Sequence, residues 1–464
     1  MSEEEKKTPH VSLGEALLIV VILLACLGGC IIYGQMPPHV PIVLVFGLLS
    51  FWGRWKGFSW DDIHGGIVNG ITPGIVPLII FLLIGVLVSS LIAAGTVPTI
   101  VVYGYQIISP NHMLISAFLI SALVGVTVGS SFTTISTMGI VLMTIGTLMG
   151  VNPIYVAGSV VSGAFWANNL SPLADTANLC AALGKLELTD HLKNLLKTCI
   201  PTTVITLAIY MMLDGGGKAL ESNAFDSMVT SLSGSFLISP IALIPIAVIL
   251  ICSWRKLPAI ATLLLGVLTS LIIFVVFAPG QGHLQMIPKI VMSGYVSNVG
   301  IETVDKLMSR GGLMSMMGSA SMIILALGMG GLLVKLEIIS TIVKNLEKFV
   351  TSLPKLVLST AIGSIMVNVL IGEQYLSIVL PGETFKPLYK KMEIDSSVMT
   401  RTLADAGSAF NSLIPWGVSG TFIVGTLGLQ GADYVLYSFY PMILPIMTIV
   451  VSIIESKKSR KVQA

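Results

Sequence analysis

Apolar segments long enough to cross a bilayer follow one another along almost the whole chain. The first runs from about 11 to 33, and a stretch of this length can span a hydrocarbon core of about 30 Å. Several others are short or interrupted by glycine and proline, so we expect about 11 to 14 membrane elements, some of them re-entrant. The pattern predicts an all-α polytopic membrane protein. The further candidate segments cover 38–53, 72–94, 112–128, 131–150, 153–168, 198–213, 236–253, 257–278, 313–334, 356–371, 375–392, 396–412 and 433–454.

Charge is scarce in this chain, which supports the same conclusion. Lys, Arg, Asp and Glu make up 10 % of the 464 residues, whereas soluble domains contain about a quarter. The net charge of +2 gives no reason to expect an anionic partner, and nucleic-acid binding is excluded. The expected partners are the lipid bilayer and a small ion or small organic substrate. The sequence leaves both a monomer and a homodimer open.

The sequence contains no motif of a soluble enzyme or of a cofactor site. It has no phosphate-binding P-loop, no His pair at metal-ligand spacing and no GxSxG elbow. The cysteines lie in or beside apolar runs without metal-ligand spacing, so we expect buried, inert thiols. They are Cys26, Cys30, Cys180, Cys199 and Cys252. We therefore predict a protein that is not an enzyme, needs no cofactor and is not driven directly by ATP.

Two polar motifs recur at one offset, which indicates an internal repeat. A shift of 243 residues places 129–139 (GSSFTTISTMG) on 372–382 (GEQYLSIVLPG), and it also places NNLSP, which begins at Asn168, on NSLIP, which begins at Asn411. The flanking charges indicate that the corresponding segments 72–94 and 313–334 begin on opposite sides of the membrane. An inverted repeat with broken or re-entrant helices is typical of secondary transporters.

The basic residues and the repeat together predict how the chain is organised. Positive residues cluster at segment ends, as at Arg54, Lys56, Arg255 and Lys256, and in the C-terminal tail. The positive-inside rule then places both termini in the cytoplasm, and the expected location is the bacterial cytoplasmic (inner) membrane. The predicted parts are a cytoplasmic tail (1–10), N-terminal membrane helices (11–65), a first transport repeat (66–213), connecting helices (214–308), a second, inverted transport repeat (309–455) and a basic cytoplasmic tail (456–464).

The first candidate site is the hydroxyl-rich segment 129–139 of the first repeat. Polar residues inside apolar segments need a partner or a function. The flanking glycines allow a broken helix, whose hydroxyls and freed carbonyls could bind Na⁺ or substrate. The alternative is that the hydroxyls bond to carbonyls of their own helix. The candidate residues are Ser130, Ser131, Thr133 and Thr134.

The second candidate site is 166–178 (WANNLSPLADTAN), where Asp175 is one of very few acids at apparent membrane depth. A carboxylate beside amides, hydroxyls and the carbonyls freed by a proline suits a hard cation or a carried proton. The alternative is that Asp175 caps a helix near the surface. The candidates are Asn168, Asn169, Ser171, Asp175, Thr176 and Asn178. Of these, we expect Asp175, Asn168 and Asn178 to bind Na⁺.

The second repeat carries acids where the first has hydroxyls. Glu373 and Gln374 occupy the positions of Ser130 and Ser131, and Asp405 falls opposite Ser162. Glu373 is a candidate proton carrier, and its alternative is a buried acid held by hydrogen bonds inside the bundle. For Asp405 the alternative is a structural pair with Arg401, four residues earlier on a predicted helix. The candidates of this repeat are Glu373, Gln374, Asp405 and Asn411.

At these motifs the sequence resembles the NhaC family of bacterial Na⁺/H⁺ antiporters, within the ion transporter superfamily. The resemblance rests on 129–139, 168–179 (NNLSPLADTANL), 372–382 and 401–416 (RTLADAGSAFNSLIPW), and it extends from about residue 10 to 455. It implies a secondary active antiporter that exchanges Na⁺ and/or H⁺ across the cytoplasmic membrane by alternating access. Na⁺ and H⁺ would be the coupling ions.

The chain departs from the family's usual pattern at several positions. Family members usually carry an acidic and a basic residue at the positions of Asn168 and Asn169, and a Glu and an Asn at those of Ala404 and Gly417. These departures leave room for a Na⁺/H⁺-coupled carrier of a small organic acid (malate/lactate type) or an amino acid. A channel would need a continuous conductive pore, and a membrane enzyme would need a nucleophile–base or metal set that is not visible.

Overall fold

The computed structural model describes residues 11–30, 36, 39–215, 222–279 and 283–463. The regular elements of this part of the chain are all helical, which confirms the predicted all-α class. Eight helices or helical runs among the described residues are long and apolar enough to cross a membrane, and the pair Ser227–Ser235 and Pro240–Trp254, bent by 73°, would be a ninth. Two shorter apolar helices, Leu13–Cys26 and Val418–Leu427, bring the total to the lower end of the expected range.

Three helices precede the first half of the repeat: α1 (Leu13–Gly28), α2 (His39–Lys56) and α3 (Trp60–Ile71). One 3₁₀ turn, η2 (Thr72–Gly74), joins α3 to α4 (Ile75–Ala93), so that both form one helical run of 34 residues. The predicted span 72–94 therefore covers only the second part of a longer helix. The hydropathy pattern did not show that α3 and α4 are continuous, because the first turn of α3 carries Asp61 and Asp62.

The second half of the chain repeats the element order of the first half. The first half contains α4, α5 (Thr96–Ile107), α6 (Met113–Val128), α7 (Ser131–Thr134), the π-helix η4 (Ile135–Gly139), α8 (Ile140–Leu148), α9 (Pro153–Leu170), α10 (Asp175–Gly184) and α11 (Leu188–Leu213). The second half contains α17 (Met317–Lys335), α18 (Ile338–Leu346), α19 (Leu353–Ile371), α20 (Gln374–Lys391), α21 (Ser396–Leu403), the π-helix η8 (Ala404–Ser408), η9 (Ala409–Leu413), α22 (Val418–Leu427) and α23 (Phe439–Gln463). At an offset of 243 residues, 131–148, 153–170 and 175–184 coincide with 374–391, 396–413 and 418–427.

A connecting region joins the two halves. It consists of α12 (Ser222–Ser235), η5 (Pro240–Leu243), α13 (Ile244–Trp254), α14 (Ala259–Phe277), α15 (His283–Ser293), α16 (Glu302–Met308) and η6 (Leu313–Met316). Short 3₁₀ turns also occur at η3 (Pro110–His112), η7 (Glu347–Phe349) and η10 (Asp433–Tyr437). The list of predicted spans omitted α5, α10, α18 and α22, because helices of 9 to 12 residues are too short to span the bilayer.

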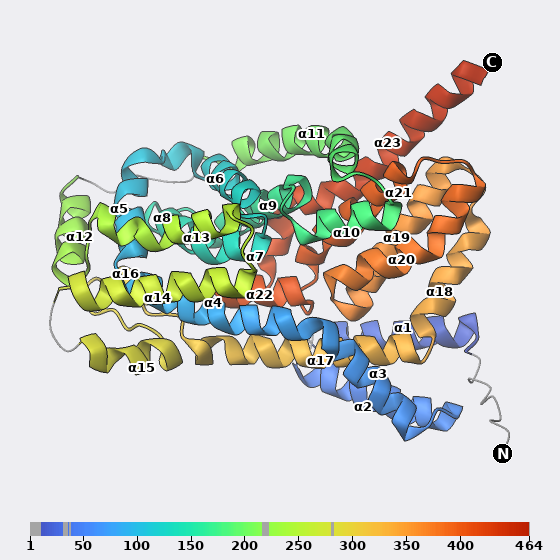
Figure 1. Ribbon diagram of the computed structural model, residues 1–464, viewed down its shortest axis with the longest axis horizontal. Coiled ribbons are helices and arrows are strands. Elements are labelled where there is room, and N and C mark those ends of the chain that lie inside the picture. The colour runs from blue at the N-terminus through green and yellow to red at the C-terminus, as the bar shows by residue number, and fades with distance from the viewer. Residues whose placement is uncertain (1–10, 31–35, 37–38, 216–221, 280–282, 464) are drawn as a thin grey trace.

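Glycines bring the helical run α3–α4 into close antiparallel contact with α17. A Cβ on Gly66 would lie 2.6 Å from Cβ of Lys335, one on Gly70 would lie 2.5 Å from Cα of Gly331, and one on Gly74 would lie 2.0 Å from Leu327 Cδ1. The residue numbers rise on one helix as they fall on the other, so the two helices run in opposite directions (Figure 1). Small residues allow such close backbone approach in membranes. This course agrees with the predicted inverted repeat.

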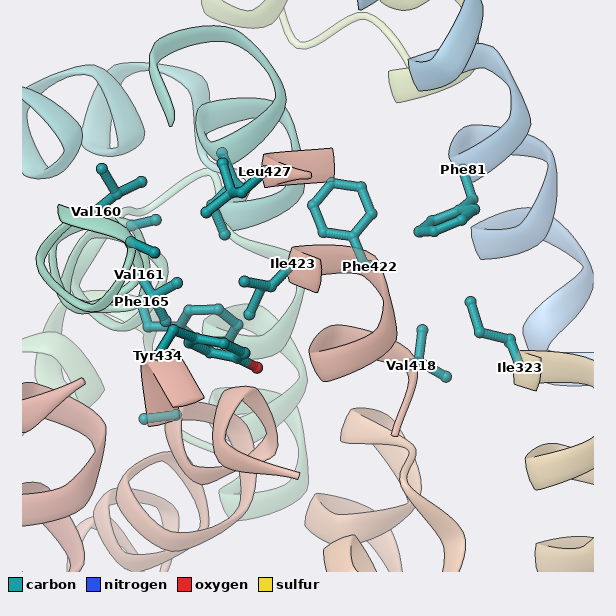
Figure 2. Close-up of a cluster of buried hydrophobic side chains, with 14 of the residues drawn as sticks. Phe81, Val160, Val161, Phe165, Ile323, Val418, Phe422, Ile423, Leu427 and Tyr434 are labelled. Atoms are coloured by element: carbon teal, nitrogen blue, oxygen red, sulfur yellow. The ribbon is translucent and has the colours of Figure 1, made fainter. Parts of the chain in front are cut away.

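The half-helix α22 lies inside the bundle rather than at its surface. Figure 2 shows Phe422 pointing toward Phe81 of α4, while Ile423 lies on the side of Val161 on α9. The rings of Phe81 and Phe422 are 5.2 Å apart in an edge-on arrangement, and Phe132 packs on Phe422 at 4.6 Å. This packing connects α22 of the second half to α4 and α7 of the first half.

Candidate functional site

Each repeat contains a helical hairpin whose tip is a glycine. Gly129 separates α6 from α7 with a φ of 74°, and Gly372 separates α19 from α20 with a φ of 73°. This left-handed conformation favours glycine and allows an abrupt change of direction. Thr134 lies next to Gly125 and Gly146 next to Met113, so α6 and the run α7–α8 are antiparallel.

Each hairpin tip packs on an interruption in the next long helix. The first interruption, at 171–174, separates α9 from α10, and the second, at 414–417, separates η9 from α22. Both contain a proline, which removes a backbone donor and ends the preceding helix. A Cβ on Gly129 would lie 2.5 Å from Cβ of Leu173, and one on Gly372 would lie 2.6 Å from Cα of Gly417. Tip and interruption therefore fit together only because the tip has no side chain.

A cavity of about 390 Å³ lies where the tip of the first hairpin, the first interruption and the start of α20 meet. Residues of α4 and α14 complete its walls, so both halves of the repeat contribute to one cavity. Its polar lining consists of Ser130, Ser131, Asn168, Asp175, Thr176, Gln374 and Tyr375, and its apolar lining includes Pro73, Val76, Pro77, Ile80, Phe132 and Ala259.

A second cavity, of about 560 Å³, adjoins the first and continues toward the turn between α13 and α14. The two share Ser130 and Asp175 among their lining residues. The second also includes Thr133, Asn178 and Lys256. Asp175 therefore lies between a narrow polar chamber and a wider space that ends beside a lysine.

Amides from both halves meet at Ser408, in the π-helix η8. Asn168 Nδ2 donates to Thr176 Oγ1 at 2.9 Å and to Ser408 Oγ at 3.3 Å. Gln374 Nε2 donates to the Ser408 carbonyl at 2.9 Å and to its hydroxyl at 2.8 Å. The Asn168 amide nitrogen is thus used in this network, while the residue also lines the cavity.

Asp175 is the acidic side chain of this cavity. It is the first residue of α10, but the N-cap position belongs to Ala174 and no side chain caps the helix. Asp175 therefore does not cap the helix as the alternative predicted, although the residue is exposed. Its carboxylate faces the hydroxyl of Tyr375, and it forms no ion pair with any described residue. One unpaired carboxylate, amide oxygens and hydroxyls form a set of hard donors, which suits Na⁺.

Three of the predicted residues donate to backbone carbonyls. The Thr134 hydroxyl donates to the Ser130 carbonyl at 2.9 Å, as the alternative interpretation of 129–139 predicted. The Ser171 hydroxyl donates to the Val126 carbonyl of α6 at 2.8 Å. The Asn178 amide donates to the carbonyls of Pro172 and Ala174, which stabilises the interruption while the residue still lines the wider cavity.

Glu373 lies outside the lining of both cavities. It is the N-cap of α20, and its carboxylate accepts a 2.7 Å hydrogen bond from the Leu376 amide. Its side chain is buried. The geometry agrees with the alternative of an acid held by hydrogen bonds inside the bundle.

Three further predicted residues, Asn169, Asp405 and Asn411, also lie away from the cavity lining. Asn411 donates to Asn368 Oδ1 at 2.8 Å and accepts from Ser419. The alternative for Asp405, a structural pair with Arg401, is wrong: the Arg401 guanidinium binds Glu455 of α23 at 2.8 Å instead. Glu455 is 54 residues from Arg401 in the sequence, but the packing of α23 brings its carboxylate into hydrogen-bond contact with the guanidinium.

The sequence prediction missed two polar contributors, Tyr375 and Ser408. Tyr375 follows Gln374 inside the motif 372–382, so its polar hydroxyl beside a candidate residue could have identified it. Ser408 follows Asp405 by three residues and was hidden by an apparently regular helix. No group of three or more His, Cys, Asp or Glu side chains in the part described could hold a metal ion, so a cation site here depends on neutral oxygen donors around Asp175.

Comparison with known proteins confirms the family resemblance predicted from the sequence. A model of the Na⁺/H⁺ antiporter family matches residues 163–454. The Na⁺/H⁺ antiporter NhaC of Alkalihalophilus pseudofirmus is 36 % identical over 96 % of both chains. NhaC of Bacillus subtilis is 34 % identical over 98 % of this chain and 100 % of its own length. The malate-2H⁺/Na⁺-lactate antiporter of Bacillus subtilis is 29 % identical over 91 % of this chain and 90 % of its own. The chain described here belongs to the Na⁺/H⁺ antiporter family.

Proposed function

We propose that this chain is a secondary active antiporter that exchanges Na⁺ for H⁺ across the bacterial cytoplasmic membrane, and that Asp175 is the central cation ligand. The observation that carries the proposal is the cavity of about 390 Å³ that both halves line and that contains one carboxylate among neutral oxygen donors. Asn168 and Asn178, with the hydroxyls of Ser130 and Thr176, would complete the cation shell. Sites at interrupted helices between inverted repeats suit alternating access.

The distribution of charge supports an orientation with both termini in the cytoplasm. In Figure 1, α1 begins and α23 ends at the same end of the molecule. Near these ends lie basic residues such as Lys56, which pairs with Glu15, and Lys197, which pairs with Glu455. Lys256, at the wide end of the second cavity, belongs to a basic turn that the positive-inside rule also places in the cytoplasm. The cavity would then open inward.

A carrier of small organic acids is the second candidate. A carboxylate substrate needs a cationic partner, and the lining of the 390 Å³ cavity contains none. Lys256 lines the wider cavity but not the 390 Å³ cavity. This favours ion exchange, but the wider cavity could admit an organic anion beside Lys256.

The test is flux through the purified full chain in proteoliposomes that contain a pH-sensitive dye. A Na⁺ gradient should drive proton movement in the wild type. Asp175→Asn should reduce this rate by about tenfold or more, a loss of at least about 1.4 kcal/mol of favourable interaction, with normal expression. Asp190→Asn, which removes an exposed acid of α11, is the control and should retain the rate. Unchanged Na⁺ dependence in Asp175→Asn would contradict the site, and movement driven only by malate, lactate or an amino acid would favour the second candidate.

A further inference from the structure

A second buried acid, Asp405, lies apart from the cation cavity. It is in the π-helix η8, and its side chain is fully buried. Thr198 of α11 and Thr448 of α23 face the carboxyl group, but neither forms a hydrogen bond of ordinary geometry with it. Neither of the cavities described above includes Asp405 in its lining.

Other polar atoms around Asp405 are also without ordinary partners. Both amide atoms of Asn169 and the hydroxyl of Thr448 are buried and make no hydrogen bond. Asn169 faces Cys199 and Tyr440, which in turn lie beside Asp405. We call Asn169, Thr198, Cys199, Asp405, Tyr440 and Thr448 the Asp405 cluster. Unmet polar atoms are rare in folded proteins and require an explanation.

Asp405 has no partner in an ion pair among the described residues, although the positive charge of Arg401 acts on its carboxyl group without direct contact. The guanidinium of Arg401, one helical turn earlier, donates to Glu455 at 2.8 and 3.2 Å and to Asn194 at 3.1 Å. Within the described residues Asp405 forms no ion pair. The other titratable groups that face it are Cys180 of α10, Cys199 of α11 and Tyr440 of α23. None of these side chains supplies a positive charge.

An ionised carboxylate buried without a partner costs several kcal/mol, whereas a protonated acid has no charge to compensate. A cation such as Na⁺ needs space and several close oxygens, but a proton needs neither. We propose that Asp405 binds the exchanged proton, at a site separate from the cation cavity. Proton binding forms the O–H bond of the acid, and release breaks it and leaves the carboxylate. No other reactant takes part.

The chain connects this proton site to the cation cavity in two places. Asn168 and Asn169 are neighbours on α9, but the first lines the cavity and the second belongs to the Asp405 cluster. Ser408, three residues after Asp405 on η8, accepts hydrogen bonds from Asn168 and Gln374. An ionised Asp405 would attract the amide of Asn169 and the hydroxyl of Thr448. Movement of α9 or η8 would then alter the position of Asn168 in the cation cavity. Proton release at Asp405 would in this way change Na⁺ binding.

This inference rests on the proposed antiport, and the test separates the two. Na⁺ binding to the detergent-solubilised full chain is measured between pH 6 and pH 9, and Na⁺-driven proton movement is measured in proteoliposomes. In Asp405→Asn, Na⁺ affinity should stay within about threefold of the wild type, a change of about 0.7 kcal/mol or less, and should no longer vary with pH. Proton movement should fall at least about tenfold. Wild-type pH dependence in this variant, or loss of Na⁺ binding at every pH, would overturn the inference.

A milder pair of variants tests the same site without removing the acid. Thr448→Val removes a hydroxyl that could donate to the ionised carboxylate, so the midpoint of the pH profile should move upward by about 0.5 to 1 pH unit, the effect of about one hydrogen bond. Thr206→Val, on α11, is the control: it also removes a buried hydroxyl without a hydrogen-bond partner, but one outside the Asp405 cluster, and it should leave the midpoint unchanged. Equal midpoints in both variants would overturn the inference. A wild type without any Na⁺-driven proton movement would instead refute the proposed antiport.

Discussion

Replacing Glu455 by glutamine should destabilise the fold far more than an ordinary surface ion pair would suggest. The carboxylate of Glu455 accepts two hydrogen bonds from Arg401 and one from Lys197. The side chain of Arg401 is 0 % exposed and that of Glu455 is 24 % exposed. In Glu455→Gln, Lys197 can turn to solvent because its side chain is 54 % exposed, but the guanidinium of Arg401 stays buried.

The magnitude follows from the unequal burial of the two partners. Removing one member of a buried pair costs about 3 to 5 kcal/mol, because the remaining charge is left uncompensated. We expect a value near about 3 kcal/mol, since Glu455 is partly exposed and Asn194 Oδ1 still accepts from Arg401 at 3.1 Å. The matched control is Asp190→Asn, which breaks a pair with Lys193 whose side chains are 59 % and 76 % exposed. Such a pair contributes about 0.5 kcal/mol or less.

Reversible unfolding in mixed micelles measures both variants at low and high salt. The loss in Glu455→Gln should persist at high salt, whereas any loss in Asp190→Asn should disappear, because solvent ions screen exposed charges more effectively. The double variant Arg401→Met, Glu455→Leu should recover most of the stability, since it leaves no buried charge. If Glu455→Gln unfolds as easily as Asp190→Asn, or if the double variant is no better than the single one, the reasoning is refuted.

Two further predictions concern the repeat itself. Gly372→Ala should lower the free energy of unfolding by about 2 to 4 kcal/mol, from a left-handed backbone and an overpacked contact, and should abolish flux, because its Cβ would lie 2.6 Å from Cα of Gly417. The control is Gly318→Ala, where nothing lies within 4 Å of the added Cβ. Equal unfolding midpoints in the two variants would count against the tip-to-interruption contact. In a variant without the native cysteines, we expect single cysteines at two positions to be labelled from opposite sides of the membrane. One replaces Ile241, in η5 beside the C-terminal end of α4, and the other replaces Glu337, just after α17, which should be on the cytoplasmic side. Labelling of both from one side would contradict the antiparallel course of α4 and α17.

The class of the protein and its internal repeat could be predicted because both depend on local patterns. Apolar runs and scarce charge require a bilayer, whatever the contacts between helices. Pro172 and Pro415 interrupt helices by removing backbone donors, and Gly129 and Gly372 permit the hairpin tips. The offset of 243 residues is visible in the motifs and reappears in the element bounds. Asn168, Asp175 and Gln374, all named as candidates from the sequence, line one cavity in the structure.

The roles of individual polar side chains depended on packing between helices that are far apart in sequence. Asn168 and Asn169 are adjacent in the chain, yet they face different sites because their side chains point in directions about 100° apart around α9. Arg401 binds Glu455 rather than Asp405, since a direct contact with α23 outweighs a helical spacing of four residues. Glu373 turns to the amides at the start of its own helix. Hydropathy and spacing describe each helix separately, whereas burial, charge compensation and access to the cavity arise only when the two halves pack together.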